Sequence, residues 1–351
     1  MNTLRSNSDN PILTIVVPSY NVGQYLKTGI SSLINHDLLD KIEVLIIDDG
    51  SKDDSLKIAD SFKGTIDHNN RRVVKVIKKG NGGHGSVINL GIEMANGKYF
   101  KLMDGDDYFD TNKFIELIKI LEQEESDIIL TDYTEYYYES STEKHINLYD
   151  FMTTGKQYQL DDITFNKRKF GPVLSTTTCK TELLKKSEIK IDEKCFYVDM
   201  EYNFIVYIMS KSVTYYPLDI YYYRLGREGQ SMQVESLIKN YSHHEKVCLR
   251  LICELQKRKG IISKNKTNYI INNIIVPMCK TQYMIVAEYI KDKTIFLSFD
   301  KKLSKYPNFY NNTVISGTII NLHRRTKGAT VPINNLLRGS AKLLNFFKNN
   351  L

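Results

Sequence analysis

Three carboxylates lie within the four residues Asp104-Gly105-Asp106-Asp107, directly after the apolar run 99–103. An apolar run of this length predicts a buried strand. Like charges at the end of a strand repel one another unless a cation lies among them. Mg²⁺ and Mn²⁺ prefer oxygen ligands and often bridge to substrate phosphates. The acidic tetrad 104–107 therefore predicts a metal site beside a phosphorylated ligand, with a solvated acidic turn as the alternative.

Three earlier apolar runs, at residues 12–17, 42–47 and 73–77, also predict buried strands. Apolar residues recur at helical spacing between the runs, so predicted strands and helices alternate through residues 12–131. The strands are apolar on both faces, which is typical of a mostly parallel central sheet flanked by helices. We therefore expect an α/β fold.

A polar cluster follows each of these predicted strands. The clusters are Pro18-Ser19-Tyr20-Asn21, Asp48-Asp49-Gly50-Ser51, Asn81-Gly82-Gly83-His84-Gly85 and the acidic tetrad. In open α/β sheets, ligands bind outside the carboxyl ends of the strands. Four polar clusters at one edge of a sheet thus favour a nucleotide and metal pocket over an isolated acidic turn.

The clusters, in this order and spacing, resemble the motifs of family-2 glycosyltransferases with the GT-A fold, such as those that build bacterial cell-surface polysaccharides. The matching segments are 17–21, 47–53, 81–92 and 102–107. The resemblance is clear over residues 11–135 and continues weakly to residue 232. It implies a nucleoside diphosphate sugar as donor, with a UDP-sugar as first choice, and transfer to a hydroxyl with inversion at the anomeric carbon.

The resemblance also implies roles on the donor side of the pocket. Pro18, Tyr20 and Asn21 match the segment that lines the nucleotide pocket. Asp49 matches the aspartate that contacts the base. Asn81 is a further donor-side candidate, and the alternative for it is that it only shapes the glycine loop.

The aspartates of the acidic tetrad are expected to have different roles in binding the metal and the donor. Asp106 is expected to ligate Mn²⁺ or Mg²⁺, which would neutralise the departing diphosphate, and Asp104 to contact the metal or the ribose. Asp107 is expected either to support these ligands or to cap the helix that begins at Thr111. Arg224, in a predicted late strand, is expected to close over the diphosphate; a surface arginine paired with an acid is the alternative.

Transfer to a hydroxyl also needs a base, and the expected base is Asp199. The segment 196–204 resembles the Glu-Asp element that opens a helix near the acceptor in this family, with Val198 in place of the glutamate. A carboxylate within hydrogen-bonding reach of the attacking hydroxyl is the usual way to remove its proton. A plain helix N-cap is the alternative role for Asp199, and Glu201 is the reserve candidate for the base.

Several other residues have open roles. His84 is expected either to contact phosphate or acceptor or to be a turn residue, and Lys180 lies where the family lines its acceptor side. A tyrosine cluster invites a sugar-stacking role, although tyrosine is also a good strand former. Its members are Tyr133, Tyr136, Tyr137 and Tyr138.

Composition narrows the class of protein further. Among 351 residues no apolar stretch reaches the length of roughly 18 residues that is needed to cross a bilayer, and the first ten residues lack the apolar core of a signal peptide. Five cysteines without a Cys-x-x-Cys pair argue against a disulfide framework or a zinc site. We expect a cytoplasmic protein. The absence of tryptophan excludes the Gln-x-x-Arg-Trp element of processive family members.

The chain is expected to have two parts: a catalytic domain at 1–232, with a donor half at 11–135 and an acceptor half at 136–232, and a helical region at 233–351. The net charge of +7 is concentrated in residues 301–351, which hold nine Lys or Arg and no Asp or Glu. Such a basic, amphipathic tail fits an anionic inner membrane surface, the catalytic domain or a second copy of the chain. We expect a glycan or lipid-linked acceptor and no nucleic-acid partner.

Two other functions compete with glycosyl transfer. A non-catalytic protein on the same fold would bind a nucleotide sugar or a glycan and release no nucleoside diphosphate. A sugar-nucleotidyltransferase would carry a glycine-rich loop with Arg and Lys after the first strand. Residues 18–23 contain no basic residue, so this alternative is the weaker one.

Overall fold

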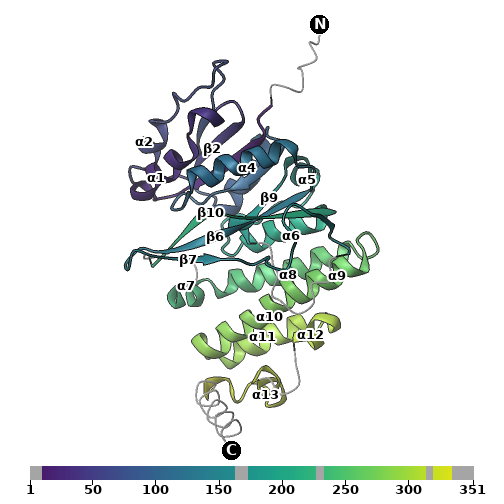
Figure 1. Cartoon of the computed structure of the whole chain (residues 1–351). Helices are drawn as coiled ribbons and strands as arrows, with labels where there is room; N and C mark the ends of the chain where they lie inside the picture. The colour runs from purple at the N-terminus through teal and green to yellow at the C-terminus, as the bar shows by residue number, and fades with distance from the viewer. Residues whose placement is uncertain (1–9, 163–172, 227–232, 314–318, 334–351) are drawn as a thin grey trace, which may run out of the picture. The chain divides into compact units, whose positions relative to one another are not determined.

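The computed structural model describes residues 10–162, 173–226, 233–313 and 319–333. The chain forms two compact units, residues 1–228 and residues 229–351, and each is described by itself. The first unit is built on a ten-stranded sheet, and the described part of the second unit is helical (Figure 1).

The sheet of the first unit has the strand order β3-β2-β1-β4-β9-β6-β10-β5, with β7 paired to β6 and β8 to β10. The strands are β1 Leu13–Ser19, β2 Ile42–Asp48, β3 Val74–Lys78, β4 Tyr99–Leu102, β5 Tyr108–Phe109, β6 Ile128–Tyr137, β7 Thr142–Ile146, β8 Gln157–Gln159, β9 Thr177–Lys180 and β10 Ser212–Leu225. Strands β1 to β4 are parallel, β9 is antiparallel to β4 and β6, and β10 is parallel to β6. The predicted α/β fold is confirmed, with a parallel first half and a mixed second half.

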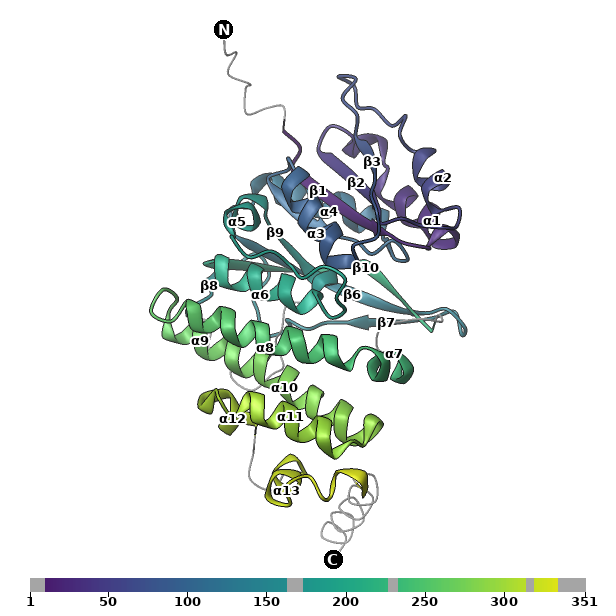
Figure 2. The ribbon, with the colours of Figure 1, turned by 180° about the vertical axis from the view of Figure 1, so that it is seen from behind.

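Helices cover both faces of this sheet. The helices of the first unit are α1 Gly23–Leu33, α2 Ser55–Asp60, α3 His84–Met94, α4 Thr111–Gln123, α5 Thr181–Lys186 and α6 Asp199–Met209, with short 3₁₀ turns at His36–Leu38 and Leu174–Thr176. Helix α4 lies in front of the sheet in Figure 1, and α3, α5 and α6 lie in front of it in Figure 2, where the view is reversed.

Alternation along β1 explains why both faces are covered. Ile15 and Val17 are fully buried in the core that includes the apolar residues of α1 and α4. Val16 points to the other face, where a Cβ added to Gly91 of α3 would meet its methyl groups at 2.7 Å. Strand β2 is buried at all seven positions for the same reason. Successive residues of such a strand bury apolar side chains on opposite faces of the sheet, so nonpolar surface is removed from water on both faces.

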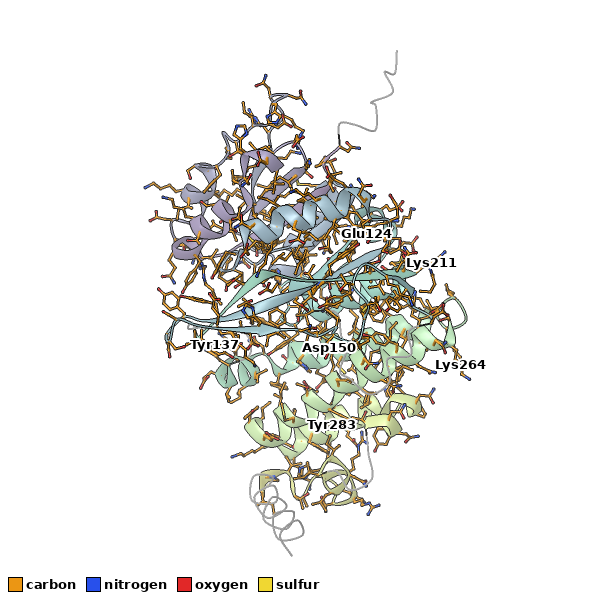
Figure 3. All side chains as sticks on the ribbon, in the orientation of Figure 1. Glu124, Tyr137, Asp150, Lys211, Lys264 and Tyr283 are labelled. Carbon is orange, nitrogen blue, oxygen red and sulfur yellow. The ribbon has the colours of Figure 1, made fainter. Side chains whose placement is uncertain are left out.

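Lys180 and the acidic tetrad lie toward opposite ends of the strands of this sheet. Figure 3 labels Glu124, just before β6, and Tyr137, at the end of β6, near opposite ends of this strand. Lys180 pairs in register with Tyr99, the first residue of β4, and its Nζ lies 3.6 Å from Asp127 Oδ1. The acidic tetrad follows the other end of β4, so the acceptor-side role expected for Lys180 is wrong: β9 runs antiparallel to β4 and ends away from the tetrad.

The described helices of the second unit are α7 Val234–Lys239, α8 Tyr241–Lys257, α9 Lys264–Ile270, α10 Val276–Met284, α11 Lys293–Leu303, α12 Pro307–Thr313 and α13 Ile319–Arg325, with π-helical turns at Ile271–Ile275 and Ile285–Ile290 and a 3₁₀ turn at Val331–Ile333. The helical character expected for this region is confirmed. Within the described ranges, no helix is both long enough and apolar enough to cross a membrane. The last part of the basic tail, 334–351, lies outside the described residues.

Candidate active site

Backbone hydrogen bonds join the polar clusters at the carboxyl ends of β1, β2 and β4. Asp49 N donates to Ser19 O at 2.8 Å, and Gly105 N donates to Pro18 O at 3.1 Å. A Cβ on Gly105 would lie only 2.5 Å from Pro18 O, so the tetrad can approach the first loop this closely only with glycine at that position. The structure therefore brings these three sequence clusters together at one edge of the sheet.

The loop after β1 is fixed in shape by Asn21. Asn21 has a left-handed backbone, with φ of 53°. Its backbone N donates to Ser51 Oγ at 3.1 Å, and its Oδ1 accepts from Lys52 N at 2.8 Å. Tyr20, the residue before it, is 47% exposed. The loop thus presents an aromatic ring on a rigid support, as the nucleotide-pocket prediction for Tyr20 and Asn21 requires.

Asp49 is engaged with the glycine loop. Its Oδ1 accepts from Lys79 Nζ at 2.6 Å and from Gly82 N at 2.9 Å, and its Oδ2 accepts from Gly83 N at 2.7 Å. The residue is 3% exposed, so this carboxylate is held by charge-assisted hydrogen bonds inside the protein. These contacts show that Asp49 holds the glycine loop against β2. Recognition of the nucleotide base by Asp49 stays a prediction. Asn81 is exposed at the tip of the same loop.

Asp107 is the buried anchor of the tetrad. Tyr221 OH donates to its Oδ2 at 2.7 Å, and Arg224 N donates to its Oδ1 at 2.9 Å. Burial, together with the negative charges of Asp106 and Asp104, raises the pKa of Asp107 well above its usual value. Helix α4 is capped instead by Asp110, whose Oδ1 accepts from the amides of the first turn. The capping role expected for Asp107 is therefore wrong, and its supporting role fits the contacts.

Arg224 is a buried arginine rather than a surface one. The residue is 8% exposed, and its Nη1 donates to the carbonyl oxygen of Asp106 at 2.7 Å. Its guanidinium carbon lies 4.7 Å from the ring centroid of Tyr108 and 5.2 Å from that of Tyr25. This arrangement fixes the backbone of Asp106 from the side of β10. The contact with the diphosphate that we expect for Arg224 stays a prediction.

Asp104 and Asp106 supply a donor set that suits a hard divalent cation. Both are carboxylates on one tight turn, and the side chain of Asp104 is 33% exposed. In the part of the chain that the structure describes, no three His, Cys, Asp or Glu side chains are grouped to hold a metal. Mg²⁺ and Mn²⁺ in phosphate-binding sites commonly use one or two carboxylates and take further ligands from the substrate phosphates and water. Asp104 and Asp106 fit the protein's share of that pattern.

The glycine loop also holds the segment that leads to Asp199. Lys194 N donates to Gly82 O at 2.6 Å. The side-chain amide of Asn89 makes two hydrogen bonds with the backbone of Ile191, one from Nδ2 to the carbonyl at 2.9 Å and one from Ile191 N to Oδ1 at 3.0 Å. A Cβ on Gly85 would overlap the carbonyl oxygen of Asp192. These contacts link α3 to a segment one hundred residues further along the chain.

Asp199 is the first residue of α6, and burial raises its pKa above the usual value for an aspartate. Tyr197, two residues earlier, has a left-handed backbone with φ of 66°, a conformation that is costly for a bulky side chain and that often occurs at functional sites. Glu201 is 2% exposed, and its Oε2 accepts from Asp192 N at 2.7 Å. Of the two candidates for the base, Glu201 therefore has a structural task that Asp199 does not share.

His84 is close to a carboxylate of the acidic tetrad and influences the predicted base. Its Nε2 is 3.5 Å from Asp104 Oδ1, and its proximity to Asp199 partly offsets the rise in the pKa of that carboxyl group. Of the two roles that the sequence left open for His84, this position favours a contact with bound ligand over a simple turn residue. His84 is thus near one carboxylate of the acidic tetrad and within electrostatic reach of the predicted base.

The tyrosine cluster is largely explained by the sheet. Tyr133, Tyr136 and Tyr137 belong to β6, as the strand-forming tendency of tyrosine predicts. Tyr136 lies edge to face with Tyr108, at 6.4 Å between ring centroids. Tyr138 packs in the same way on Tyr25 of α1, also at 6.4 Å. Two of the four rings thus pack on tyrosines of neighbouring elements, which a structural role explains.

Sequence reasoning missed three residues that shape the site: Lys79, Asn89 and Tyr221. Lys79 follows β3, and its partner Asp49 lies 30 residues earlier in the chain. Asn89 lies within the motif segment 81–92, and Tyr221 lies in β10, the strand predicted around Arg224. The partners of Asn89 and Tyr221 lie 102 and 114 residues away, so no local pattern could identify them.

Comparisons with known proteins agree with this geometry. Residues 14–181 match the model of the family described as Glycosyl transferase family 2. Glycosyltransferase GlyG of Streptococcus pneumoniae is 28% identical over 240 residues, which cover 64% of this chain and 74% of that protein. The cholesterol galactosyltransferase of Borreliella burgdorferi is 24% identical over 305 residues, which cover 83% of this chain and 81% of that protein.

Two further likenesses are to a teichoic acid biosynthesis protein and to a solved structure. The minor teichoic acid biosynthesis protein GgaB of Bacillus subtilis is 25% identical over 245 residues, which cover 69% of this chain and 26% of that protein. The crystal structure of S. aureus TarS 1–349 in complex with UDP-GlcNAc matches with a TM-score of 0.55 and 19% identity, covering 90% of this chain and 92% of that one. Residues 14–181 therefore form a domain of the kind described as Glycosyl transferase family 2, and the fold is the GT-A fold seen in the TarS structure.

Proposed function

We propose that this glycosyltransferase is metal dependent and inverting, and that it moves a sugar from a UDP-sugar to a hydroxyl of a glycan or lipid-linked acceptor. One observation supports the proposal: backbone hydrogen bonds join the loops that follow β1, β2 and β4, and His84 lies 3.5 Å from Asp104 of the acidic tetrad. The hydrogen bonds of Asp49, Asn89 and Gly82 hold these groups in place from different parts of the chain.

The proposed reaction is a single displacement. The acceptor oxygen forms a bond to the anomeric carbon while the bond from that carbon to the diphosphate oxygen breaks, and the electron pair leaves with the diphosphate. Asp199 takes the proton of the acceptor hydroxyl. Because the hydroxyl attacks from the face opposite the leaving group, the anomeric configuration inverts. The buried environment that raises the pKa of Asp199 makes it a stronger base than an exposed aspartate.

Asp106 and Asp104 are the proposed ligands of Mn²⁺ or Mg²⁺. A bound cation would supply Lewis-acid stabilisation of the negative charge on the departing diphosphate. Asp107 and Arg224 hold the tetrad in shape, Tyr20 and Pro18 line the base and ribose side, and Asn21 orders that loop. Asp49 and Asn81 complete the donor side through the glycine loop.

The choice of donor and acceptor draws on similar proteins. TarS of the same fold has been crystallised with UDP-GlcNAc, which favours a UDP-sugar here. GgaB is named for teichoic acid biosynthesis and another relative for galactosyl transfer to cholesterol. We infer an acceptor from cell-surface polymer assembly, either a glycan or a lipid-linked one.

A nucleotide-sugar panel tests the proposal. The full chain is incubated with UDP-, GDP- and dTDP-sugars, with Mn²⁺, Mg²⁺ or EDTA, and release of nucleoside diphosphate is measured with and without bacterial glycan acceptors. We expect metal-dependent release from a UDP-sugar. A non-catalytic nucleotide-sugar or glycan-binding protein would bind the donor and release nothing. Pyrophosphate-dependent formation of a nucleoside triphosphate would indicate a sugar-nucleotidyltransferase instead.

We further propose that the protein works in the cytoplasm at the inner face of the membrane, through the basic tail. Residues 331–351 join apolar residues at helical spacing to Arg338, Lys342 and Lys348. Basic amphipathic segments bind anionic bilayers through both the apolar face and the positive charge. Deleting residues 331–351 should abolish binding to liposomes that contain phosphatidylglycerol. If binding to the liposomes is unchanged, light scattering of the two forms will show whether the tail joins copies of the chain instead.

A further inference from the structure

His84 occupies a position that the assigned roles leave unexplained. It begins the 11-residue helix α3, and its side chain is 32% exposed. Its Nε2 atom is nevertheless buried and makes no hydrogen bond with any residue that the structure describes. Asp104 Oδ1, at 3.5 Å, is close enough for an electrostatic contact but not placed for a hydrogen bond. A buried nitrogen without such a partner is costly unless a ligand satisfies it.

The imidazole is held in this position by rigid surroundings. Gly83, just before it, has a φ of 79°, and a Cβ there would lie 3.2 Å from the backbone of Lys194. Gly85, just after it, has no room for a Cβ beside the carbonyl of Asp192. His84 therefore stands between two glycines that are packed against the segment leading to Asp199. The backbone position of His84 therefore follows from this packing.

The groups near the imidazole indicate what it would meet. Asp104 lies in the tetrad proposed to hold the metal and the diphosphate. Asp199 is near enough for the imidazole to lower the pKa of its carboxyl group, against the rise that burial causes. In the proposed reaction, the bond that breaks joins the anomeric carbon to the diphosphate, which the acidic tetrad is proposed to hold. An N–H group 3.5 Å from Asp104 would be within reach of an oxygen of that leaving group.

We propose that His84 is a substrate-binding residue that donates a hydrogen bond from Nε2 to an oxygen of the donor diphosphate. This inference rests on the proposed function, because it needs a nucleoside diphosphate in the pocket. It assigns His84 to the leaving group, whereas Asp199 serves the acceptor. The hydrogen bond would also separate the negative charges of the diphosphate from that of Asp199.

Binding of UDP and UMP to variants at this position tests the proposal. His84→Gln keeps an N–H donor near the place of Nε2, whereas His84→Ala and His84→Asn remove it. Isothermal titration calorimetry is carried out on the full chain with Mn²⁺ present. Because a hydrogen bond to a charged group is lost, we expect the affinity for UDP to fall about 10-fold or more in the Ala and Asn variants. Affinity for UMP should change much less, and His84→Gln should recover part of the loss.

Two controls keep the inference separate from the proposed function. His68→Ala removes an exposed histidine in the loop before β3 and should leave UDP binding unchanged. The melting temperatures of all variants are compared so that loss of folding is not read as loss of binding. If wild-type protein binds UDP and His84→Ala binds it equally well, the inference is overturned and the proposed function stands. If wild-type protein binds no nucleoside diphosphate with any metal, both are overturned.

Discussion

Replacing Asn89 by alanine should disable the catalytic side of the pocket without touching the donor side. Asn89 makes two hydrogen bonds with the backbone of Ile191, at 2.9 and 3.0 Å, and thereby holds the segment that leads to Asp199. Alanine removes both bonds and leaves the amide and the carbonyl of Ile191 without these partners. The donor-side loops, which depend on Asn21 and Asp49, keep their own hydrogen bonds.

The expected size of the effect follows from the hydrogen bonds lost. Each net hydrogen bond contributes about 0.5–1.5 kcal/mol, so Asn89→Ala should lower the free energy of unfolding by about 1–3 kcal/mol. In a unit of this size each kcal/mol corresponds to roughly 2–4 °C in melting temperature, which gives a decrease of about 2–12 °C. If Asp199 is displaced by about 1 Å, turnover should fall on the order of 100-fold.

The assay has three readouts on the same samples: thermal unfolding, UDP affinity and sugar transfer. We expect reduced melting temperature, unchanged UDP affinity within about 3-fold, and strongly reduced turnover, since a 3-fold change is only about 0.7 kcal/mol. Asn112→Ala, an exposed position of α4, is the matched control and should change none of them. Wild-type turnover in a destabilised Asn89→Ala protein would refute the idea that this contact positions the base.

Three further predictions follow from the site and its surroundings. Asp106→Ala should abolish metal-dependent binding of the donor, measured by calorimetry with Mn²⁺ and with EDTA; equal binding in the two conditions by wild-type protein would contradict the metal proposal. Asp199→Asn should bind UDP normally and lose transfer by at least about 100-fold, as expected for loss of a general base; normal turnover would show that the base is elsewhere. Burial raises the pKa of Asp132 from 3.8 to about 6, so the folded protein binds this proton more tightly than the unfolded chain. Its contribution to stability is therefore complete below about pH 4 and is lost as the pH rises through about 6, and Asp132→Asn should be more stable than wild type at pH 8 by on the order of 2–3 kcal/mol in urea unfolding. A variant that is less stable than wild type at pH 8 would mean that the Tyr215 hydrogen bond to Asp132, at 2.8 Å, outweighs the cost of burying the charge.

Much of the first unit was predictable because its signals are local. The apolar runs that became β1, β2 and β4 were buried on both faces, and the helix expected from Thr111 appears as α4 at Thr111–Gln123. The polar clusters that follow β1, β2 and β4 were expected to meet because parallel strands end at the same edge of a sheet. The predictions that were wrong concerned which residues contact one another in the folded chain. Asp107 was considered as a helix cap and Lys180 as an acceptor-side residue, and both depend on strands that pair with segments distant in the chain.

By itself, the sequence determined the alternation of strands and helices, the edge at which the polar clusters gather and the chemical type of the groups there, because these properties depend on periodicity and side-chain chemistry over short windows. Only the tertiary structure decided which groups act together. It assigned Asp107 to Tyr221 and the backbone of Arg224, bound Asp49 to the glycine loop, and placed His84 beside Asp104. These partners are set by strand pairing and by close packing at glycines, across up to 117 residues of chain. Such contacts leave no local pattern, since each depends on a geometry that exists only when the sheet has formed.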